Sequence, residues 1–307
     1  MSLLVVGSVA FDSVETPFGK AKEAIGGSAM FFSTSASYFN QIRLVAVVGS
    51  DFPEAEIDFL KSRNVDCKGL HRAEGKTFRW KGKYGFDLNE AITLETQLNV
   101  FGDFHPELPS DYRDCEAVFL ANIDPTLQLE VLEQVNKPRF VAADTMNYWI
   151  DSKREELEKV LRRVNMVIIN ETEARKIAEE PNIVVAARKI QDLGPEYVVI
   201  KRGEYGALCF AQEEVFFAPA YPLEAVFDPT GAGDTFAGGL LGYLTSRDEI
   251  TPRDLRQATV VGCVMASFCV EDFSLEAMRG LTRERIEERF KMFQELSRFE
   301  HLEMLNS

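Results

Sequence analysis

Apolar and polar positions divide the chain into short strand-like runs that alternate with amphipathic helical segments. The strand-like runs are nearly all apolar and lie at Leu3–Ser8, Leu44–Gly49, Ala117–Ala121, Phe140–Asp144, Met166–Asn170, Tyr197–Lys201 and Ala207–Phe210. The helical segments lie at Ser28–Phe39, Glu54–Arg63, Leu127–Val135, Lys153–Arg163, Glu171–Ala178, Ile183–Leu193, Asp234–Leu244, Pro252–Phe268 and Arg283–Phe299. This alternation predicts a mainly parallel sheet covered on both faces, the doubly wound α/β class. In such folds, ligands bind beyond the C-terminal ends of the strands.

One region departs from this pattern. From Thr77 to Phe101, residues alternate as in antiparallel strands with one solvated face, and aromatic residues first share one parity while Lys and Arg share the other. Residues 10–25 are also poor in helix signals and can add to the same sheet. We therefore expect one domain over residues 1–307, with a small β-sheet lid formed by about 10–25 and 75–105. A plain hairpin decoration is the alternative.

Composition and charge narrow the class of protein. The 307 residues are 46% hydrophobic and 27% charged, which is ordinary for a soluble globular protein. The net charge of -15 argues against nucleic acid or an anionic membrane as a partner. No apolar run approaches the roughly 18 residues that a membrane span needs. Any phosphate ligand must therefore be held by local features against the field of the whole molecule.

Cysteine usage indicates a reducing compartment. The five cysteines are scattered, odd in number and never in CxxC spacing, which favours reduced thiols. The apolar opening Leu3–Val6 has no basic residues before it and favours a first strand over a secretory signal. We therefore expect a cytoplasmic protein.

The segment Asp228–Phe236 carries the most specific chemistry in the chain. Gly231, Ala232 and Gly233 leave the backbone N–H groups uncovered where a helical run begins, and a helix start attracts anions. Asp234 beside this anion site would repel a bound anion. The arrangement is consistent if negative charge develops there during a reaction and Asp234 removes a proton from the attacking group.

Three further motifs follow strand-like runs, and each allows two interpretations. Asn170 and Glu173 form either a helix capping box or a site for Mg²⁺ and its waters. Lys201–Gly206, with Gly203 and Gly206, forms either an exposed turn or a phosphate contact. Gly26 and Gly27 allow close approach of a ligand to the backbone, and Asp12 can accept hydrogen bonds from its hydroxyls; an ordinary turn and cap is the alternative.

Several well-known sites are missing. The chain has no GxxxxGK[ST] phosphate loop and no GxSxG elbow. No GxGxxG follows the first strand, which counts against a nicotinamide-dependent oxidoreductase.

Taken in order, these motifs resemble the ribokinase-like carbohydrate kinases of the PfkB family over nearly the whole chain. Asp228–Phe236 is similar to the family signature near the C-terminus, Gly26–Gly27 to its N-terminal glycine pair and Gly49–Asp51 to its GxD element. Asn170–Glu173 is similar to the NxxE motif, and Lys201–Gly206 to the turn on the nucleotide side.

The resemblance implies transfer of the γ-phosphoryl group of ATP to a substrate hydroxyl, with Mg²⁺. It implies Asp234 as the base, the amides of Gly231, Ala232 and Gly233 as the anion hole, and Asn170 with Glu173 as organisers of Mg²⁺. It assigns Lys201, Gly203, Gly206, Asp228 and Thr230 to the ATP side, and Asp12, Gly26 and Gly27 to the acceptor. The resemblance also makes a homodimer that forms through the lid possible. It does not decide whether a monovalent cation takes part.

The chain departs from the family pattern on the acceptor side. Ala10-Phe11-Asp12 stands where ribokinase-type members have NxD, and Phe31 stands where they carry asparagine. This apolar neighbourhood either stacks on a base, as in an adenosine-like nucleoside kinase, or belongs to the core. Asn122 and Asn147 can replace the lost polar contacts. We expect a kinase that acts on a sugar or sugar-containing substrate. A nucleoside kinase of the same fold is the alternative, and a non-catalytic ligand-binding relative is the third hypothesis.

Overall fold

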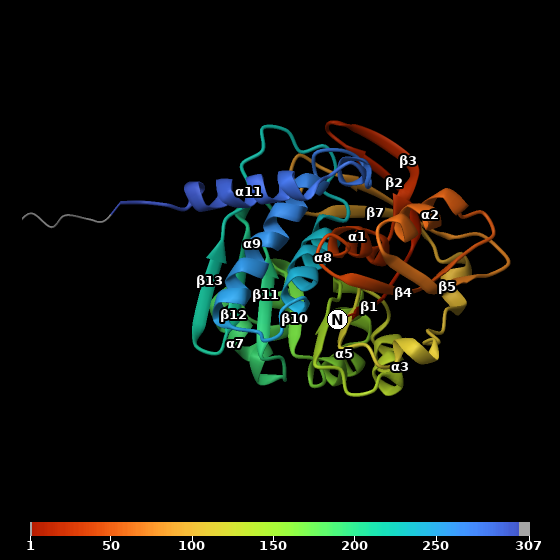
Figure 1. Cartoon of the computed structure of the whole chain (residues 1–307), viewed down its shortest axis with the longest axis horizontal. Helices are drawn as coiled ribbons and strands as arrows, with labels where there is room; N and C mark the ends of the chain where they lie inside the picture. Colours follow the sequence, from red (N-terminus) through yellow and green to blue (C-terminus); the bar gives the residue numbers. More distant parts are fainter. Residues whose placement is uncertain (1, 301–307) are drawn as a thin grey trace, which may run out of the picture.

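A nine-stranded sheet forms the centre of the computed structural model, which describes residues 2–300 (Figure 1). The strands are ordered β13-β12-β11-β10-β9-β8-β1-β4-β5, and the pairs β11–β12 and β12–β13 are antiparallel whereas the other pairs are parallel. Their bounds are β1 Ser2–Val6, β4 Gln41–Val48, β5 Val65–Arg72, β8 Ala117–Leu120, β9 Phe140–Ala143, β10 Met166–Asn170, β11 Tyr197–Lys201, β12 Ala207–Ala211 and β13 Glu214–Ala218.

Helices cover both faces of this sheet. Alternate residues of its strands therefore pack into two different hydrophobic cores. Leu3 and Val5 of β1 pack into one core, whereas Leu4 and Val6 pack into another. The first core takes α1 Ser28–Ala36, α2 Glu54–Ser62, α8 Ala232–Thr245, α9 Pro252–Cys269, α10 Glu276–Arg279 and α11 Arg283–Leu296. The opposite face takes α3 Pro125–Gln134, α4 Asn147–Ser152, α5 Arg154–Leu161, α6 Glu171–Ala178 and α7 Ile183–Asp192.

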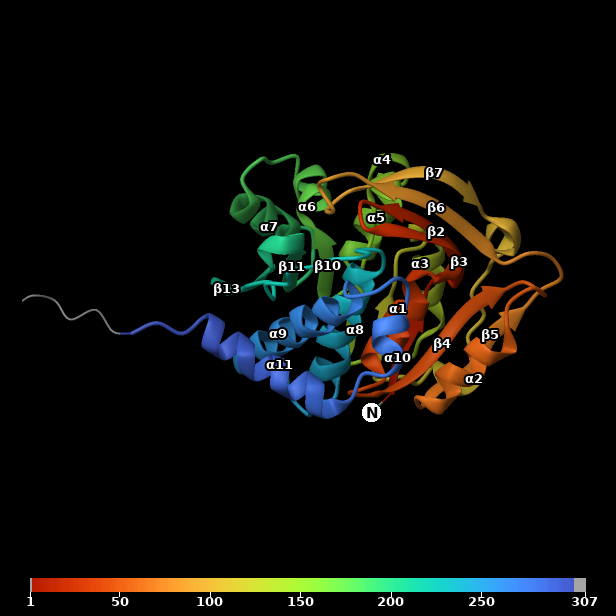
Figure 2. The same cartoon turned by 90° about the horizontal axis from the view of Figure 1, so that it is seen from above.

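A separate four-stranded sheet lies along one side of the core (Figure 2). Its order is β3-β2-β6-β7, with bounds β2 Ala10–Thr16, β3 Gly19–Gly26, β6 Phe78–Tyr84 and β7 Ala91–Gln97. The pairs β2–β3 and β6–β7 are antiparallel, whereas β2 and β6 run parallel. The two segments predicted for the small sheet therefore form it together, and we call it the lid.

The predicted elements agree with the structure most closely in the middle of the large sheet. The bounds of β10, β11 and α6 are those predicted. Strands β5 and β13, at the two edges, were not predicted, because edge strands expose polar residues and lack a continuous apolar run. Helix α8 begins at Ala232, earlier than predicted.

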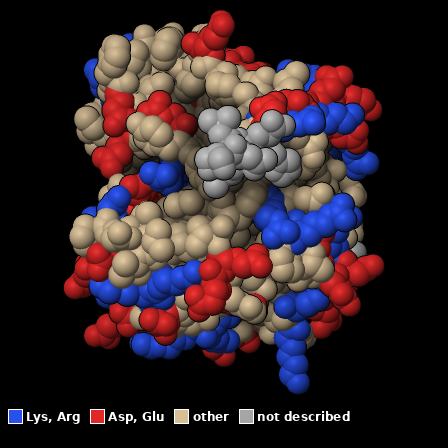
Figure 3. All heavy atoms as spheres, turned by 90° about the vertical axis from the view of Figure 1, so that its left-hand side faces the viewer, with Lys and Arg blue, Asp and Glu red and all other residues tan. Residues whose placement is uncertain are grey.

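The outer surface mixes charges of both signs. On the side of β13 and α11, basic and acidic side chains are interspersed (Figure 3). Within residues 2–300, no helix combines the length and the apolar character that a membrane crossing requires.

Candidate active site

The C-terminal ends of three neighbouring strands place Asp144, Asn170 and Lys201 together. Asn170 and Lys201 are paired residues at the ends of β10 and β11, and Asp144 directly follows β9. The Lys201 ammonium Nζ lies 3.0 Å from Asp144 Oδ2, and both side chains are largely buried. A buried ion pair therefore stands at the edge of the sheet where α/β folds bind ligands.

Asn170 and Glu173 form the capping box that their spacing allows. Asn170 Oδ1 accepts a hydrogen bond from the Glu173 N–H at 2.8 Å, and Glu173 Oε2 accepts one from the Asn170 N–H at 2.7 Å. The Glu173 side chain is buried beneath the start of α6. Capping uses one carboxylate oxygen of Glu173, so the structural role of this residue does not exclude a second one.

The glycine loop before α8 has the backbone conformation of an anion site. Gly231 has φ 75°, in the left-handed region that favours glycine, and a Cβ at Gly231 would lie 2.4 Å from the Phe31 ring. The Ala232 N–H donates to the Pro229 carbonyl at 3.1 Å. Within residues 2–300, the N–H groups of Gly231 and Gly233 have no hydrogen-bond partner. Two of the three predicted amides are thus available to an anion.

Asp234 lies in the first turn of α8, beside the same ion pair. Burial raises the pKa of Asp234 to about 7, and the nearby Asp144 carboxylate adds to the shift. Burial, with Asp144, also raises the pKa of Glu173 to about 8. Burial disfavours the Lys201 ammonium, but the carboxylates of Asp144, Glu173 and Asp234 outweigh it and raise the pKa of Lys201. The centre therefore holds more negative than positive charge once its carboxyl groups are ionised.

The glycine pair and Asp12 come together as predicted. Gly27 has φ 93°, and a Cβ there would lie 2.6 Å from the Ser8 carbonyl oxygen. A Cβ on Gly26 would overlap the Asp12 carboxylate at 1.8 Å, so that carboxylate lies directly on the glycine backbone. Burial raises the pKa of Asp12 to about 7, and the Asp228 and Asp234 carboxylates contribute although the Gly27 N–H opposes the shift. Asp12 thus faces the same centre as Asp234.

The aromatic residues near the glycine pair belong to the core. Phe31 is 2% exposed and packs against Gly231, and Phe32 stacks on Phe119 with centroids 4.3 Å apart. Phe11 packs against Phe52, with the Arg79 guanidinium 5.0 Å above its ring. The core-packing alternative therefore accounts for these residues.

Asn122 and Asn147 present unsatisfied oxygens near the same strand ends. Asn122 follows β8, and Asn147 begins α4 after β9. The side-chain oxygen of each is buried without a hydrogen-bond partner among residues 2–300. An unpaired buried amide oxygen costs about 1–3 kcal/mol, so both atoms are poised to accept a hydrogen bond from a ligand.

The turn after β11 and the signature loop both contact the lid. Gly203 has φ 52° and Gly206 has φ 85°, and the side chain of Asn89 fills the space beside Gly203. Thr230 Oγ1 donates to the Tyr84 hydroxyl at 3.4 Å, and its N–H donates to Asp228 Oδ1 at 2.9 Å. The β6–β7 hairpin thus reaches the residues assigned to the ATP side.

A family model of pfkB family carbohydrate kinases matches residues 6–279. The chain belongs to this family. It is therefore an ATP-dependent phosphotransferase that acts on a hydroxyl group of a sugar or sugar-containing substrate, and the predicted ribokinase-like fold is confirmed.

Two curated relatives align with most of this pfkB-family kinase. It is 32% identical to the cytidine kinase of Thermococcus kodakarensis over 254 residues, which cover 80% of this chain and 90% of that protein. It is 22% identical to the nucleoside kinase of Methanocaldococcus jannaschii over 263 residues, which cover 84% of this chain and 82% of that protein.

Solved structures agree on the fold of the kinase. The Burkholderia thailandensis nucleoside kinase in complex with inosine superposes with a TM-score of 0.76 at 18% identity, covering 94% of this chain and 98% of that one. A putative ribokinase II from E. coli in complex with ATP and Mg²⁺ superposes with a TM-score of 0.77 at 19% identity, covering 96% and 99%.

Sequence reasoning placed Asp144 at a strand end where ligands bind but gave it no role, and it gave none to Tyr84. Asp144 follows a strand end, which is a signal, but its pairing with Lys201 depends on strand order. Tyr84 lies on the lid and is buried against Thr230. The alternating aromatic pattern of 77–86 did not single it out.

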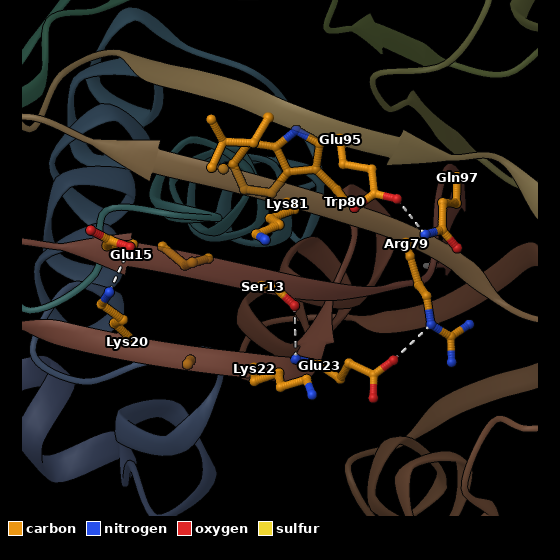
Figure 4. Close-up of a pocket in the computed structure, with 14 residues that line it drawn as sticks. Ser13, Glu15, Lys20, Lys22, Glu23, Arg79, Trp80, Lys81, Glu95 and Gln97 are labelled. Carbon is orange, nitrogen blue, oxygen red and sulfur yellow. Dashed lines mark hydrogen bonds and ion pairs between the residues drawn. The ribbon is translucent and has the colours of Figure 1, made fainter.

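The outer face of the lid carries its own hollow. By strand alternation, Ser13, Glu15, Arg79 and Lys81 lie on the face opposite Asp12. A hollow of about 490 Å³ is lined by these residues and by neighbours on β3 and β7 (Figure 4). Glu15 pairs there with Lys20 at 2.8 Å. This hollow is separate from the centre that contains Asp234.

The raised carboxyl pKa values predict how stability depends on pH. A carboxyl group whose pKa is raised by folding binds its proton more tightly in the folded state, so its contribution is complete near pH 4 and is lost as the pH rises through about 7. Asp234→Asn removes this loss. We therefore expect the variant to gain more in melting temperature over the wild-type kinase at pH 8 than at pH 5, measured by scanning calorimetry. An equal difference at both pH values would contradict a pKa of Asp234 that folding raises.

Proposed function

We propose that this kinase transfers the γ-phosphoryl group of ATP to a hydroxyl of a nucleoside, with cytidine as the leading acceptor. The observation that carries this proposal is the 32% identity to a cytidine kinase over most of both chains. The departures from the ribokinase pattern count against ribose itself as the acceptor, because the buried Phe31 stands where ribokinase-type members carry an asparagine that contacts the sugar.

Polar groups for such an acceptor are present. Asp12 accepts hydrogen bonds from acceptor hydroxyls beside Gly26 and Gly27. The unpaired oxygens of Asn122 and Asn147 accept from the hydroxyl or amino groups of a nucleoside. A ligand that satisfies these buried atoms gains affinity over one that leaves them unpaired.

The donor side is organised around Lys201 and the start of α8. The Gly231 and Gly233 N–H groups hold the transferring phosphoryl group, and the Lys201 ammonium offsets its charge. A Cβ on Gly233 would lie 3.1 Å from Lys201 Nζ, so the ammonium and these amides share one small volume. Gly203, Gly206 and Thr230 lie on the ATP side, where the lid hairpin contacts them.

The reaction needs one proton acceptor. The acceptor hydroxyl gives its proton to Asp234 while its oxygen bonds to the γ-phosphorus and the bond to the bridging β–γ oxygen breaks, leaving ADP. A pKa of about 7 leaves Asp234 largely ionised just above neutral pH and still basic enough to accept the proton.

The centre fits a magnesium ion that reaches it with ATP. Asp144, Glu173 and Asp234 surround the single Lys201 ammonium. Among residues 2–300, no group of three or more His, Cys, Asp or Glu side chains is placed to hold a metal ion by itself. Mg²⁺ characteristically keeps several waters and binds through one or two carboxylates and substrate phosphates. Glu173, backed by Asn170, is our candidate to hold its waters. When bound, the ion neutralises charge on the β and γ phosphates.

The acceptor is tested by measuring ADP release with Mg-ATP over a panel of cytidine, uridine, adenosine, inosine, ribose and fructose. We expect cytidine to give the highest kcat/KM. A sugar that surpasses every nucleoside would overturn the nucleoside assignment and leave the kinase assignment intact. Binding of panel members without turnover of any of them would favour a non-catalytic relative.

Glu173→Gln is expected to raise the Mg²⁺ concentration needed for half-maximal rate. Glutamine keeps the capping geometry at Asn170 but cannot ionise, whereas Glu173, with its pKa raised to about 8, offers a carboxylate to the hydrated ion once its proton is lost. A magnesium titration at saturating ATP measures the change. Because glutamine retains the cap, an unchanged Mg²⁺ requirement would assign Glu173 to capping alone.

We also propose that a monovalent cation assists turnover, and that Asp228 orders the signature loop on the ATP side. The Asp228 side chain is 2% exposed, burial raises its pKa, and its oxygens accept hydrogen bonds from the N–H groups of Thr230 and Ser274. Replacing K⁺ by a bulky organic cation is expected to slow turnover. An unchanged rate would show that turnover does not depend on a monovalent cation.

We further propose that residues 1–307 act as one kinase domain and that two copies associate through their lids. Every residue of the edge strand β7 is exposed, including Ile92 and Leu94. An open edge of this kind invites pairing with another strand. Sedimentation equilibrium should give twice the chain mass of 34.6 kDa, and monomers at micromolar concentration would exclude this arrangement.

The free cysteines support a reducing compartment, which we propose to be the cytoplasm. All five are unpaired, and four of them are buried. Localisation of a tagged chain in its own cells tests this directly.

A further inference from the structure

The Lys201 ammonium stands among carboxylates from three different elements. Asp144 follows β9, Glu173 lies in the first turn of α6, and Asp234 lies in the first turn of α8. A lysine has a flexible stem of four carbons and a compact charge, so it can pair with any of them. In the structure it pairs with Asp144 at 3.0 Å, across the end of β10, which lies between β9 and β11.

The position of Asp144 is fixed by its own surroundings. The side chain is 4% exposed, and Oδ1 accepts a hydrogen bond from the Thr145 N–H at 2.8 Å. Its backbone carbonyl accepts from Gln128 Nε2 at 3.0 Å. Gln128 is fully buried and also donates to the carbonyls of Leu120 and Ala121, at the end of β8. Asp144 therefore presents one carboxylate oxygen at a set place.

We propose that Asp144 is a positioning residue that holds the Lys201 ammonium against the first turn of α8 and keeps it from pairing with Asp234. This inference rests on the proposed function, in which Lys201 offsets phosphate charge and Asp234 is the base. It concerns the donor side alone and does not depend on which hydroxyl compound is the acceptor.

The consequence of losing Asp144 follows from charge. A released ammonium moves toward the remaining carboxylates, and an ion pair with Asp234 occupies the lone pairs that must accept the substrate proton. The same pair stabilises ionised Asp234, which makes it a weaker base. The phosphoryl group then also loses a cation at the correct place, and a displacement of about 1 Å can cost about a hundredfold in rate.

A double-mutant cycle tests the proposal. Asp144→Asn keeps the hydrogen bond from Thr145 and should lower kcat by about tenfold to a hundredfold, with the KM of the acceptor unchanged. Lys201→Met should lower kcat further. The double variant should match Lys201→Met within about twofold, because Asp144 acts only through Lys201. Asp151→Asn is the matched control, since Asp151 pairs with Lys176 at 2.8 Å on the exposed surface, and it should leave kcat unchanged.

The pH dependence of kcat separates positioning from a structural role. The acidic limb reports ionisation of the base in the enzyme–substrate complex. In Asp144→Asn it should move to lower pH, because Asp234 loses a repulsive neighbour and gains the ammonium. Lost packing alone would lower the melting temperature without moving this limb. If Asp144→Asn does not fold, Asp144→Glu displaces the ammonium by one methylene and should show the same fall in kcat.

Two results would overturn the proposal: a wild-type kcat in Asp144→Asn, or effects of the two substitutions that multiply in the double variant. Both are read in the assay in which the wild-type kinase turns over. They are therefore distinct from failure of the proposed function, which is read from the acceptor panel and from Asp234→Asn.

Discussion

Asp234→Asn is expected to lower kcat by about 10²–10⁴-fold while the affinity for ATP stays close to that of the wild-type kinase. Asparagine keeps the size of the side chain at the start of α8 but cannot take up the proton of the attacking hydroxyl. In the proposed function, ATP binding depends on the backbone amides and Lys201, which the substitution leaves in place. The rate would be measured as ADP release at saturating acceptor, and the affinity by calorimetry.

A matched control for this variant is Asp58→Asn. Asp58 is an exposed carboxylate on α2, where it pairs with Lys61 at 3.6 Å. We expect this control to keep the wild-type rate. A near-normal kcat in Asp234→Asn would end the assignment of Asp234 as the base.

Gly231→Ala is expected to lower kcat by at least about a hundredfold, because it displaces the loop that we propose to hold the phosphoryl group. Two independent constraints act there. A non-glycine residue at φ 75° costs about 1–3 kcal/mol, and the new Cβ would lie 2.4 Å from the Phe31 ring, which is buried and cannot move aside. Steady-state kinetics and a urea unfolding curve would measure the two effects.

Gly280→Ala is the control for this second prediction. No heavy atom lies within 4 Å of a Cβ built at Gly280, and the residue has an ordinary negative φ of -98°. We expect it to leave both kcat and stability nearly unchanged. Wild-type activity in Gly231→Ala would show that the loop before α8 does not position the transferring group.

The parts of the fold and site that follow from local pattern could be predicted from the sequence. Strands β10 and β11 are apolar runs inside a sheet that is covered on both faces. The capping box formed by Asn170 and Glu173 marks the first residues of α6. The loop before α8 could be predicted from its glycines alone, because a tight turn requires a positive φ and Gly231 has one. The family resemblance then supplied expected roles for these positions.

Other features depend on how distant segments meet. The pair between Asp144 and Lys201 joins residues 57 positions apart, and it forms because β9, β10 and β11 lie side by side. From the sequence alone Phe31 is a candidate for contact with a base, and the position of Gly231 against its ring assigns it to the core. Glu90 on the lid hairpin accepts a hydrogen bond from Thr172 at 3.1 Å. Nothing in either local sequence indicated this contact.

The most direct test of the central claim follows the γ-phosphoryl group itself. The kinase would be incubated with cytidine and with ATP that carries ¹⁸O at the non-bridging γ oxygens. The masses of the products would then be measured by mass spectrometry. The account predicts cytidine monophosphate that carries the label, together with unlabelled ADP. Label found only in inorganic phosphate, with every nucleoside and sugar of the panel left unphosphorylated, would contradict it.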